Sequence, residues 1–356
     1  HFYAGYVDVE VTPSERTTAD FAVRFEDYSD FGSTLDGKIA LAFKATEDFT
    51  LRGSISSGFR APSLQQRFFS STFTDFISGE PVDVLLAPNG GEIARAAGIP
   101  DLTEETSLNG GIGFTWRASD VLSFTVDIYQ INIDDRIVLS GRFNTDDPNI
   151  GDILAGLNVG EAQFFTNAVD TETSGIDITA SWDSTLWDGE LTASWDSTLW
   201  DGELTTYFGF NYGETEVTAI NAPAALVGRE DVLLSERERL FIENGAPESK
   251  GILGFDWTRD KWNANVKFIY FGEQTLGTFS GPPVPNQHYN AKASADFSLT
   301  YSITESTKLT AGMANVFDST PTRQNPDETD NGHVFESVQF GLNGASWFVR
   351  MHSRFF

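Results

Sequence analysis

The sequence has no cysteine, only two methionines, and fewer than half as many basic as acidic residues. Because Cys is absent, neither a disulfide framework nor a thiolate metal site can form. The formal net charge of -29 argues against a nucleic-acid partner, because phosphate binding needs clustered Lys and Arg. The composition therefore removes three kinds of site before any motif is considered.

Long apolar runs are also missing. No stretch approaches the roughly 18 to 20 residues that a membrane-spanning helix requires, which excludes helical spans. Strands that cross a membrane give a different signal, segments of roughly 10 residues with alternating polarity. No secretory signal opens the chain, because residues 1–5 already have the pattern of a strand. We expect that the N-terminal part of the protein is missing from this sequence.

The abundant residues favour β-structure. The chain contains 32 Gly, 30 Phe, 9 Tyr and 8 Trp, so it is rich in strand-forming aromatics and turn residues. We therefore predict an all-β fold. Alternating polarity predicts about 13 strands, near residues 2–11, 19–29, 35–45, 49–58, 104–117, 120–137, 168–182, 202–216, 249–258, 262–274, 288–302, 307–317 and 345–356.

The predicted connections alternate between short turns and long loops. A soluble sandwich scatters its loop lengths over both ends, whereas an outer-membrane barrel has short periplasmic turns and long outer loops. The alternation therefore favours an antiparallel transmembrane β-barrel. The long loops that would meet a ligand are 64–103, 138–166, 217–248, 275–288 and 318–344.

Tryptophan follows the short turns. Trp prefers the bilayer interface, since its ring is apolar while its N–H needs a polar partner. We predict a girdle at the periplasmic rim; the alternative is that these rings cover the end of a soluble core. Seven of the eight Trp lie beside predicted short turns, and only Trp347 does not: Trp116, Trp182, Trp187, Trp195, Trp200, Trp257 and Trp262.

Two strands indicate which side chains face lipid. In the strand near 120–137, apolar residues at 122, 124, 126 and 128 alternate with polar ones, and the phase switches after Tyr129 so that Ile131 and Ile133 follow. The switch predicts a bulge, or a strand that leaves the bilayer. In the last strand, Arg350 and Arg354 are expected to face the lumen, because a basic residue facing lipid costs about 2–4 kcal/mol.

A 13-residue segment, 180–192, recurs without change as 193–205. An odd insertion inside a spanning strand would exchange its two faces. We predict that the repeat extends a periplasmic hairpin; the alternative is a duplication introduced when the sequence was read or built.

Candidate catalytic and metal-binding residues are few. The four histidines, His1, His288, His333 and His352, are not at metal-ligand spacing, and no nucleophile elbow or phosphate-binding loop is present. The acidic pairs 134–135 and 146–147 could be catalytic or calcium-binding carboxylates, but solvated loops are favoured. We expect no metal, no cofactor and no catalytic residue. Loop carboxylates could take part in the divalent-ion bridging of lipopolysaccharide.

Two segments near the start carry a family resemblance. Residues 25–34 (FEDYSDFGST) end a strand in an acidic, aromatic tip, and residues 51–64 (LRGSISSGFRAPSL) run into Pro62, which forbids further ladder pairing. They look like the signature of TonB-dependent receptors, the plugged transporters of Gram-negative outer membranes. Further segments resemble the same barrel in matching order: 102–107 with Gly111, 124–129, 131–137, 164–168, 174–177 and 315–318.

The resemblance implies an architecture and partners. Such receptors have an N-terminal plug, a TonB-contacting box and a barrel of about 22 strands. Residues 1–356 are then the C-terminal portion of the barrel, with the plug and roughly nine strands absent. The implied partners are the TonB energy-transducing complex, acting through the absent plug, and outer-membrane lipid and lipopolysaccharide. The terminal residues 355–356 resemble the insertion signal of outer-membrane proteins, with one extra residue.

The implied function is energised uptake of a scarce ligand, with no covalent chemistry and no prosthetic group. Family substrates include ferric siderophores, haem, cobalamin and oligosaccharides. A passive porin and a surface-binding β-protein stay open as alternatives. The ligand-contacting residues are not predicted by the loops, although Phe68, Phe69, Phe73 and Phe76 could stack a flat or sugar ligand or pack on one another.

Overall fold

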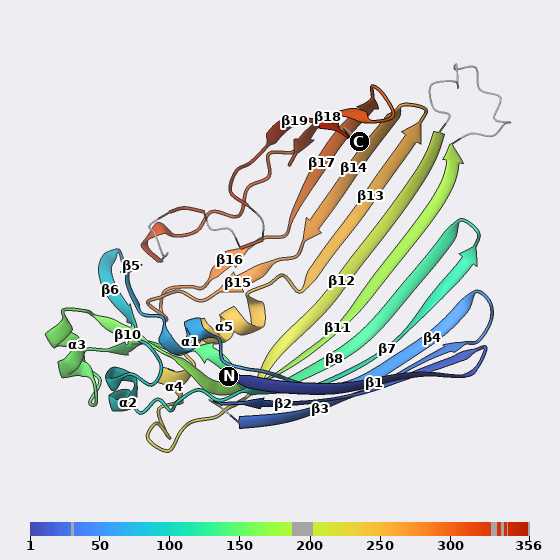
Figure 1. The fold of residues 1–356 in the computed structure, drawn as a ribbon. Helices are drawn as coiled ribbons and strands as arrows, with labels where there is room; N and C mark the ends of the chain where they lie inside the picture. Colours follow the sequence, from blue (N-terminus) through green and yellow to red (C-terminus); the bar gives the residue numbers. More distant parts are fainter. Residues whose placement is uncertain (30–31, 187–201, 329–332, 336–337, 340, 355–356) are drawn as a thin grey trace.

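The computed structural model describes residues 1–29, 32–186, 202–328, 333–335, 338–339 and 341–354. One antiparallel sheet of 13 strands dominates the fold, and its spatial order follows the chain (Figure 1). The prediction of an all-β fold with about 13 strands is confirmed. The strands are β1 (Phe2–Ser14), β2 (Thr17–Tyr28), β3 (Gly32–Lys44), β4 (Phe49–Arg60), β7 (Glu105–Ser119), β8 (Leu122–Leu139), β11 (Phe165–Leu186), β12 (Gly202–Ile220), β13 (Ser249–Arg259), β14 (Trp262–Phe271), β17 (Lys292–Ser302), β18 (Thr307–Ala314) and β19 (Ser346–Ser353).

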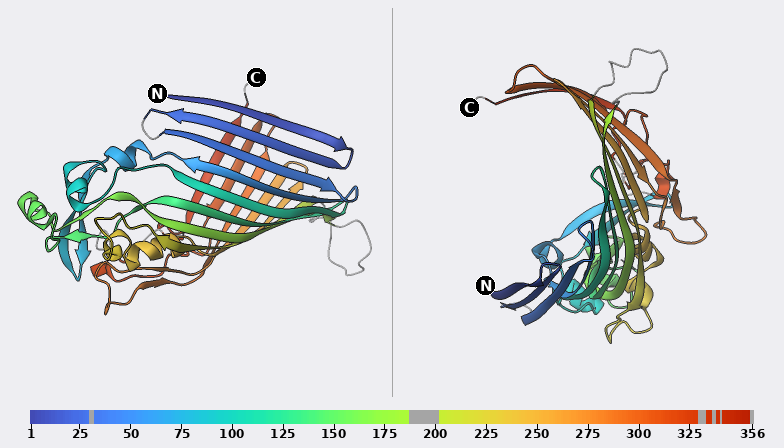
Figure 2. Two further views of the ribbon diagram at one scale, coloured as in Figure 1. Left: turned by 90° about the horizontal axis from the view of Figure 1, so that it is seen from below. Right: turned by 90° about the vertical axis from the view of Figure 1, so that its right-hand side faces the viewer.

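The sheet curves into an open trough whose two edges are β1 and β19 (Figure 2). Among the described residues, each edge strand pairs on one side only, β1 with β2 and β19 with β18. Neighbouring strands of this sheet also follow one another along the chain, which is the up-and-down pattern of a barrel wall. The trough is consistent with one part of a larger barrel.

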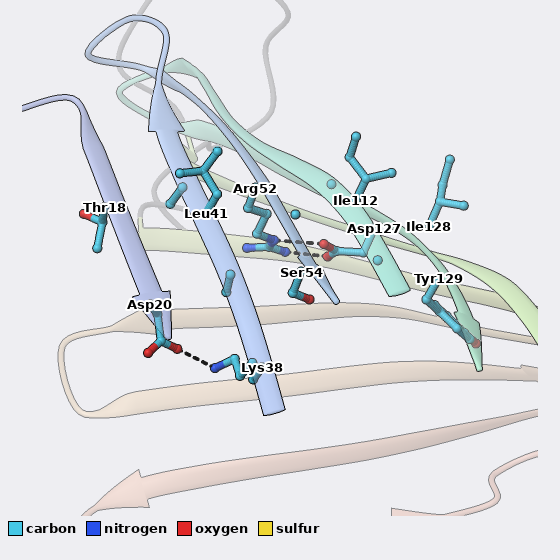
Figure 3. A pocket seen from close by; sticks show the side chains of 15 residues that line it. Thr18, Asp20, Lys38, Leu41, Arg52, Ser54, Ile112, Asp127, Ile128 and Tyr129 are labelled. Carbon is cyan, nitrogen blue, oxygen red and sulfur yellow. Dashed lines mark hydrogen bonds and ion pairs between the residues drawn. The ribbon is translucent and has the colours of Figure 1, made fainter. Parts of the chain in front are cut away.

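The sheet has one apolar and one polar face, as the alternation predicts. Directly opposed residues of an antiparallel pair lie on the same face, so Ile112, Ile128 and Ile176 form one apolar row across three strands. Ile112 and Ile128 are 64% and 54% exposed. In Figure 3 Ile112 and Ile128 point to one side of the sheet, whereas Lys38 and Tyr129 point to the other. An exposed apolar face of this extent suits lipid.

Strand β8 shows that the predicted bulge at Tyr129 is wrong. Its register with β7 is unbroken from Ser123 to Asp134, so Ile131 and Ile133 continue on the polar face. The irregularity lies further along, at Asp135, where φ is 53° and the register with β11 shifts. The phase switch in the sequence therefore marks where the strand enters a different environment, the second alternative.

The long connections gather at one end of the sheet and carry their own elements (Figure 1). We call the described residues within 61–104, 140–164, 221–248, 272–291 and 315–345 the loop layer. Its elements are α1 (Leu64–Phe68), β5 (Ser71–Ile77), β6 (Glu80–Leu86), α2 (Glu92–Ala97), β9 (Phe143–Asn144), α3 (Gly151–Leu157), β10 (Glu161–Gln163), α4 (Glu230–Leu233), α5 (Glu236–Asn244), β15 (Gln274–Leu276), β16 (Gln287–Tyr289) and the 3-10 helix η2 (Pro326–Glu328). Across the described ranges, no helix is long and apolar enough to cross a membrane.

The hydrophobic core lies mainly in the loop layer, not in the wall. Ile150, Leu154, Phe164, Leu226 and Leu233 are fully buried and belong to one cluster. A wall that turns its apolar side chains outward has no dry interior of its own. The loops therefore bury apolar side chains against one another, as a small soluble domain does.

Four tryptophans beside short turns are described, and all share the apolar face near the turn end. Trp116, Trp182 and Trp262 are 45%, 53% and 42% exposed, while Trp257 is half-buried. Their placement agrees with the predicted interface girdle. Trp187, Trp195 and Trp200 lie outside the described residues, as does most of the tandem repeat. The described ends of the repeat continue the pairing of β11 with β12 as far as Leu186 and Gly202.

Candidate ligand-binding and transport site

The polar face of the trough, called the inner wall here, carries an ion pair between β4 and β8 (Figure 3). Arg52 Nε donates to Asp127 Oδ1 at 2.8 Å, and a second nitrogen of the same guanidinium contacts the other carboxylate oxygen. Arg52 Nη1 lies 3.4 Å from Thr115 Oγ1. Gly113 makes room for this contact, because a Cβ there would lie 2.1 Å from Asp127 Oδ1. The pair ties β4, β7 and β8 together.

A second pair lies toward the N-terminal edge of the wall. Lys38 Nζ donates to Asp20 Oδ2 at 2.7 Å, linking β3 to β2. Both pairs line a cavity of about 420 Å³, together with Ser54 and Tyr129 (Figure 3). Because each cation has a carboxylate partner, this part of the wall offers polar groups to water or a ligand without a free basic charge.

Guanidinium groups gather where the wall meets the loop layer. Arg60 Nε donates to Glu105 Oε2 at 2.6 Å, and Glu105 also accepts from the backbone N–H of Ile137 at 2.7 Å. Arg136 is half-buried and donates to Thr171 Oγ1 at 3.2 Å. The carboxylate of Glu105 thus lies among two arginines, and its own residue is only 5% exposed.

Arg136 also lines a cavity of about 370 Å³ under α5. Arg237 and Phe241 come from α5, and Val138 supplies apolar surface from β8. Arg237 lies over the Phe241 ring at 4.5 Å and within 3.5 Å of the buried carboxylate of Glu238. The lining thus carries two guanidinium groups and one carboxylate, that of Glu238, beside an aromatic ring. The net positive charge suits an anionic ligand that has flat or apolar parts.

Two adjacent residues, Phe279 and Ser280, join all parts of the loop layer. The guanidinium carbons of Arg142 and Arg237 lie 4.6 and 3.9 Å from the Phe279 ring centroid. Ser280 donates to Glu328 through its backbone N–H at 2.9 Å and its hydroxyl at 2.5 Å. We call this dipeptide the loop hub, because each of the other four long connections contacts it.

The hub closes a hydrogen-bond network around the buried carboxylate of Glu328. The Ser280 hydroxyl lies 2.8 Å from that of Ser78, at the tip of the β5–β6 hairpin. Ser78 also donates its backbone N–H to Glu328 Oε1 at 3.1 Å. Glu328 is 5% exposed and accepts three bonds, so its charge is satisfied by donors from two other loops.

Buried ion pairs hold further segments of the loop layer. Arg142 contacts both Asp75 and Glu161, the latter at 2.8 Å. Arg229 Nη2 lies 2.5 Å from Asp147 Oδ2, and Asp147 Oδ1 accepts from the backbone N–H groups of 149 and 150. Burial acts to raise the pKa of Asp147, but the hydrogen bonds from Arg229 and the two N–H groups outweigh it, so the pKa is lowered.

The family model for the β-barrel of TonB dependent receptor-like proteins matches residues 1–316. The chain belongs to this family. It is an outer-membrane protein of a family of receptors, not of enzymes. The resemblance seen in the sequence is confirmed over most of the chain.

Individual relatives are distant and longer than this receptor barrel. The probable TonB-dependent siderophore receptor PirA of Acinetobacter baumannii is 24% identical over 139 residues, 38% of this chain and 17% of its own length. The crystal structure of PirA from that organism gives a TM-score of 0.63 at 15% identity, covering 99% of this chain and 45% of PirA. The chain thus spans less than half of that receptor.

Two other solved structures show the same fold. The ferric enterobactin receptor PfeA of Pseudomonas aeruginosa, a mutant in complex with enterobactin, gives a TM-score of 0.64 at 16% identity, covering 99% of this chain and 45% of PfeA. The copper transporter OprC gives 0.61 at 15% identity, covering 99% and 48%. These likenesses concern the fold alone.

The receptor barrel exposes the predicted aromatic residues. Phe68, Phe69 and Phe73 are 63%, 51% and 37% exposed, whereas Phe76 is half-buried. Phe68 and Phe69 do not pack into the loop; the guanidinium carbon of Arg67 lies 5.1 Å from the Phe68 ring. The first of the two alternatives, an aromatic surface open to a ligand, agrees with their exposure.

The four histidines do not come together. His288 lies 3.7 Å from Glu273, His333 accepts through its backbone oxygen from Gln324, and His1 is at the start of the wall. Over the described ranges, no cluster of three or more potential metal ligands occurs. His352 lies on the inner wall beside Arg350, which faces the lumen as predicted and lines a hollow with Thr300 and Thr310. That Arg354 also faces the lumen stays a prediction.

The acidic pairs divide. Asp146 is exposed in a loop, as expected, whereas Asp134 and Asp135 are exposed but lie within strand β8, so the expectation of a loop is wrong for that pair. Asp147 is 8% exposed and ion-paired, so the same prediction is wrong for it. Sequence reasoning also missed Arg52 with Asp127 and the loop hub. Gly113, which lies opposite Asp127, leaves the space for the ion pair with Arg52 and could have indicated it. That indication can be used only once the register of β7 with β8 is known.

Proposed function

We propose that the chain is the wall and loop layer of an importer that takes up a ferric siderophore with energy from the TonB complex. A ligand binds first at the loop layer and then at the arginines beneath it. A plug preceding this part of the barrel closes the lumen and carries the TonB contact. The family match supports this proposal most strongly.

The cavity at Arg136, Arg237 and Phe241 supports the choice of cargo. Siderophores surround ferric iron with anionic oxygens, and cationic and aromatic side chains suit such a surface. PirA and PfeA are named for siderophores, whereas OprC is named for copper, so the fold does not select the cargo. A passive porin would need no arginine-lined cavity under a folded loop layer.

The exposed Phe68, Phe69 and Phe73 favour a second candidate, an oligosaccharide or another flat-faced ligand. Stacking on aromatic rings would hold such a ligand without charge. Substituting the cavity arginines should therefore weaken binding of an anionic ligand, whereas substituting the exposed phenylalanines should weaken binding of an oligosaccharide.

The test is uptake by a gene deletion strain carrying the full receptor or its variants. We expect the deletion strain to grow poorly on limiting iron. In cells with the full receptor, uptake of ferric siderophore should stop when the proton gradient is collapsed. The Arg136→Gln variant should bind the ferric siderophore with lower affinity. Phe69→Ala serves as the matched variant for the oligosaccharide route. Uptake that persists without a proton gradient would support a passive porin, and growth failure on a polysaccharide alone would support the second candidate.

A further inference from the structure

Strand β8 carries one extra residue where the wall meets the loop layer. From Ile133 to Arg136 it advances three positions, whereas its partner β11 advances two, from Thr171 to Val169. The extra residue is absorbed at Asp135, whose φ is 53°. This left-handed conformation is uncommon for residues other than glycine, although Asp and Asn adopt it more readily than most. The irregularity is therefore a β-bulge in β8.

The bulge decides which way Arg136 points. Side chains alternate along a strand, and Ile133 lies on the inner wall, so a regular strand would turn Arg136 to the outer face. One extra residue reverses this order. Arg136 is directly opposite Val169, and its Nη1 donates to the Thr171 hydroxyl at 3.2 Å. Val169 and Thr171 are 0% and 2% exposed, so the guanidinium is on the inner side, where it lines the cavity under α5.

Side chains of β11 bond both backbone groups of Asp135. Its N–H donates to Asp170 Oδ1 at 2.9 Å, and its carbonyl oxygen accepts from Asn167 Nδ2 at 2.6 Å. Asn221 Nδ2 donates to the same Asp170 oxygen at 2.8 Å. Asn167 also exchanges two bonds with the backbone of Thr103, at 2.9 and 3.1 Å. The bulge is thus fixed to the wall and to two of the long connections.

The backbone of Asp135, rather than its carboxylate, makes the bulge. The side chain is exposed, and its Oδ1 accepts a long bond of 3.4 Å from Asn221. Position 135 supplies a left-handed backbone, which glycine would also supply. Such conformations cost energy and concentrate at functional sites. A conformation of this kind, held in place directly before Arg136, points to the direction of that guanidinium as what it serves.

We propose that the bulge at Asp135 is a positioning device, which turns the guanidinium of Arg136 from the outer face of the wall into the cavity under α5. A regular strand would present the carboxylate of Asp135 on the inner face instead, because alternate residues share a face. The bulge therefore replaces an anion by a cation in the cavity and selects for anionic ligands. This inference rests on the proposed function, in which Arg136 contacts such a ligand.

Two substitutions at position 135 separate the backbone from the carboxylate. Asp135→Gly keeps the left-handed conformation, whereas Asp135→Val opposes it, because a β-branched residue is a strong outlier at this φ. Both remove the same charge, so each is the matched control of the other. With a ferric tris-catecholate siderophore as the anionic probe, we expect the full receptor with Asp135→Gly to bind as the native receptor does. Asp135→Val should lose about ten- to a hundredfold in affinity, as when a charge-assisted bond is removed.

A double-mutant cycle distinguishes positioning from a general loss of structure. If the bulge acts through Arg136, the Arg136→Gln substitution should weaken binding in the Asp135→Gly background and add almost nothing in the Asp135→Val background. Full additivity in both backgrounds, or equal affinities of Asp135→Gly and Asp135→Val, would overturn the proposal.

Cysteine labelling follows the direction of residue 136 without any ligand. The chain has no cysteine, so Arg136→Cys gives one reactive thiol in a full receptor from which any other cysteine is removed. A bulky maleimide should label this thiol slowly in the native and Asp135→Gly backgrounds, and much faster with Asp135→Val. Ala162→Cys, at a fully buried position of the loop layer, should stay unreactive in all three backgrounds if the layer is folded. Should it react with Asp135→Val, the milder Asp170→Ala, which removes the acceptor of the Asp135 N–H, takes its place, with Asp170→Asn as its control.

The labelling result is separable from the proposed function. Equal rates at position 136 in the compared backgrounds would contradict the positioning, whatever the receptor binds. The expected pattern of rates in a native receptor that does not bind the siderophore would contradict the proposed cargo and leave the bulge as the device that sets the direction of Arg136.

Discussion

Side chains of the inner wall lie flat across glycines of the neighbouring strand. Tyr207 is directly opposite Gly254, where a Cβ would lie 1.9 Å from the ring atom Cζ. Tyr129 crosses Gly175 and approaches Gly213, with its hydroxyl oxygen 2.4 and 3.1 Å from their Cβ positions. These glycines are used because only they allow a ring to pack on the backbone of the wall.

Gly254→Ala should therefore destabilise the wall. The added methyl group must displace the Tyr207 ring, and overpacking of this kind costs about 1–3 kcal/mol. Gly209→Ala is the matched control, because nothing lies within 4 Å of its Cβ position on the same face. The urea midpoint in detergent should fall for the first variant and stay nearly unchanged for the second. Equal midpoints would show that Tyr207 moves aside freely.

Asp147 makes the stability of the loop layer depend on pH in the acid range. Its pKa is lower in the folded chain than the ordinary value of about 3.9. The stabilisation is complete above the unfolded pKa and is lost as the pH falls toward the folded one. Limited proteolysis of the loop layer should accelerate in that window below about pH 4.

Asp147→Asn should remove this part of the acid response. The amide oxygen can still accept from the N–H groups of 149 and 150, but Arg229 loses its ion pair, at a cost of about 1–3 kcal/mol at neutral pH. Asp146→Asn is the control, because Asp146 is exposed. An unchanged pH profile in Asp147→Asn would assign the acid response to other carboxylates.

At the scale of elements, the loop hub makes separate connections behave as one layer. Phe279 and Ser280 contact Arg142, Arg237, Ser78 and Glu328, which come from four different connections. Coupled elements of this kind open together rather than singly. Movement of one loop toward a ligand should therefore also move the other loops.

Ser280→Ala tests this coupling. It removes the hydroxyl bonds to Glu328 and Ser78, leaves Glu328 with two backbone donors, and should cost about 1–3 kcal/mol. Hydrogen exchange should speed up at Ser78 and around 326–328 as well as at 280. Ser306→Ala, at the short-turn end, is the control and should leave the layer unchanged. Acceleration confined to 272–291 would show that the loops open independently.

The sequence predicts the wall better than the loop layer. Alternation at Leu122, Phe124 and Val126 identifies the lipid face because each strand has only two environments. It does not reveal that Arg52 meets Asp127, since their contact depends on the register of three strands. Nor does it reveal the core around Phe164 and Leu226, because apolar side chains in irregular loops follow no period. The bulge predicted at Tyr129 is wrong, because Ile131 and Ile133 are apolar residues that continue on the polar face in an unbroken register with β7.

At the scale of the whole molecule, the trough has two edges, β1 and β19, that pair with no further strand of the described chain. The edge strand β1 is exposed along its full length, with Tyr3 and Tyr6 at 68% and 73%. At the other edge, Trp347 and Met351 are 80% and 67% exposed. Unpaired backbone groups are costly in lipid, and open edges pair with whatever strand is available. We therefore expect each of the two edges to pair with another strand.

The 356-residue chain alone should self-associate in detergent, because its edges can pair only with other copies. We expect dimers or larger species by light scattering. Tyr6→Pro removes a backbone donor from the β1 edge and should reduce association, whereas Val23→Pro in β2, inside the sheet, should instead unfold the N-terminal strands. A strictly monomeric chain of 356 residues would mean that the trough closes on itself, which would contradict the open order from β1 to β19.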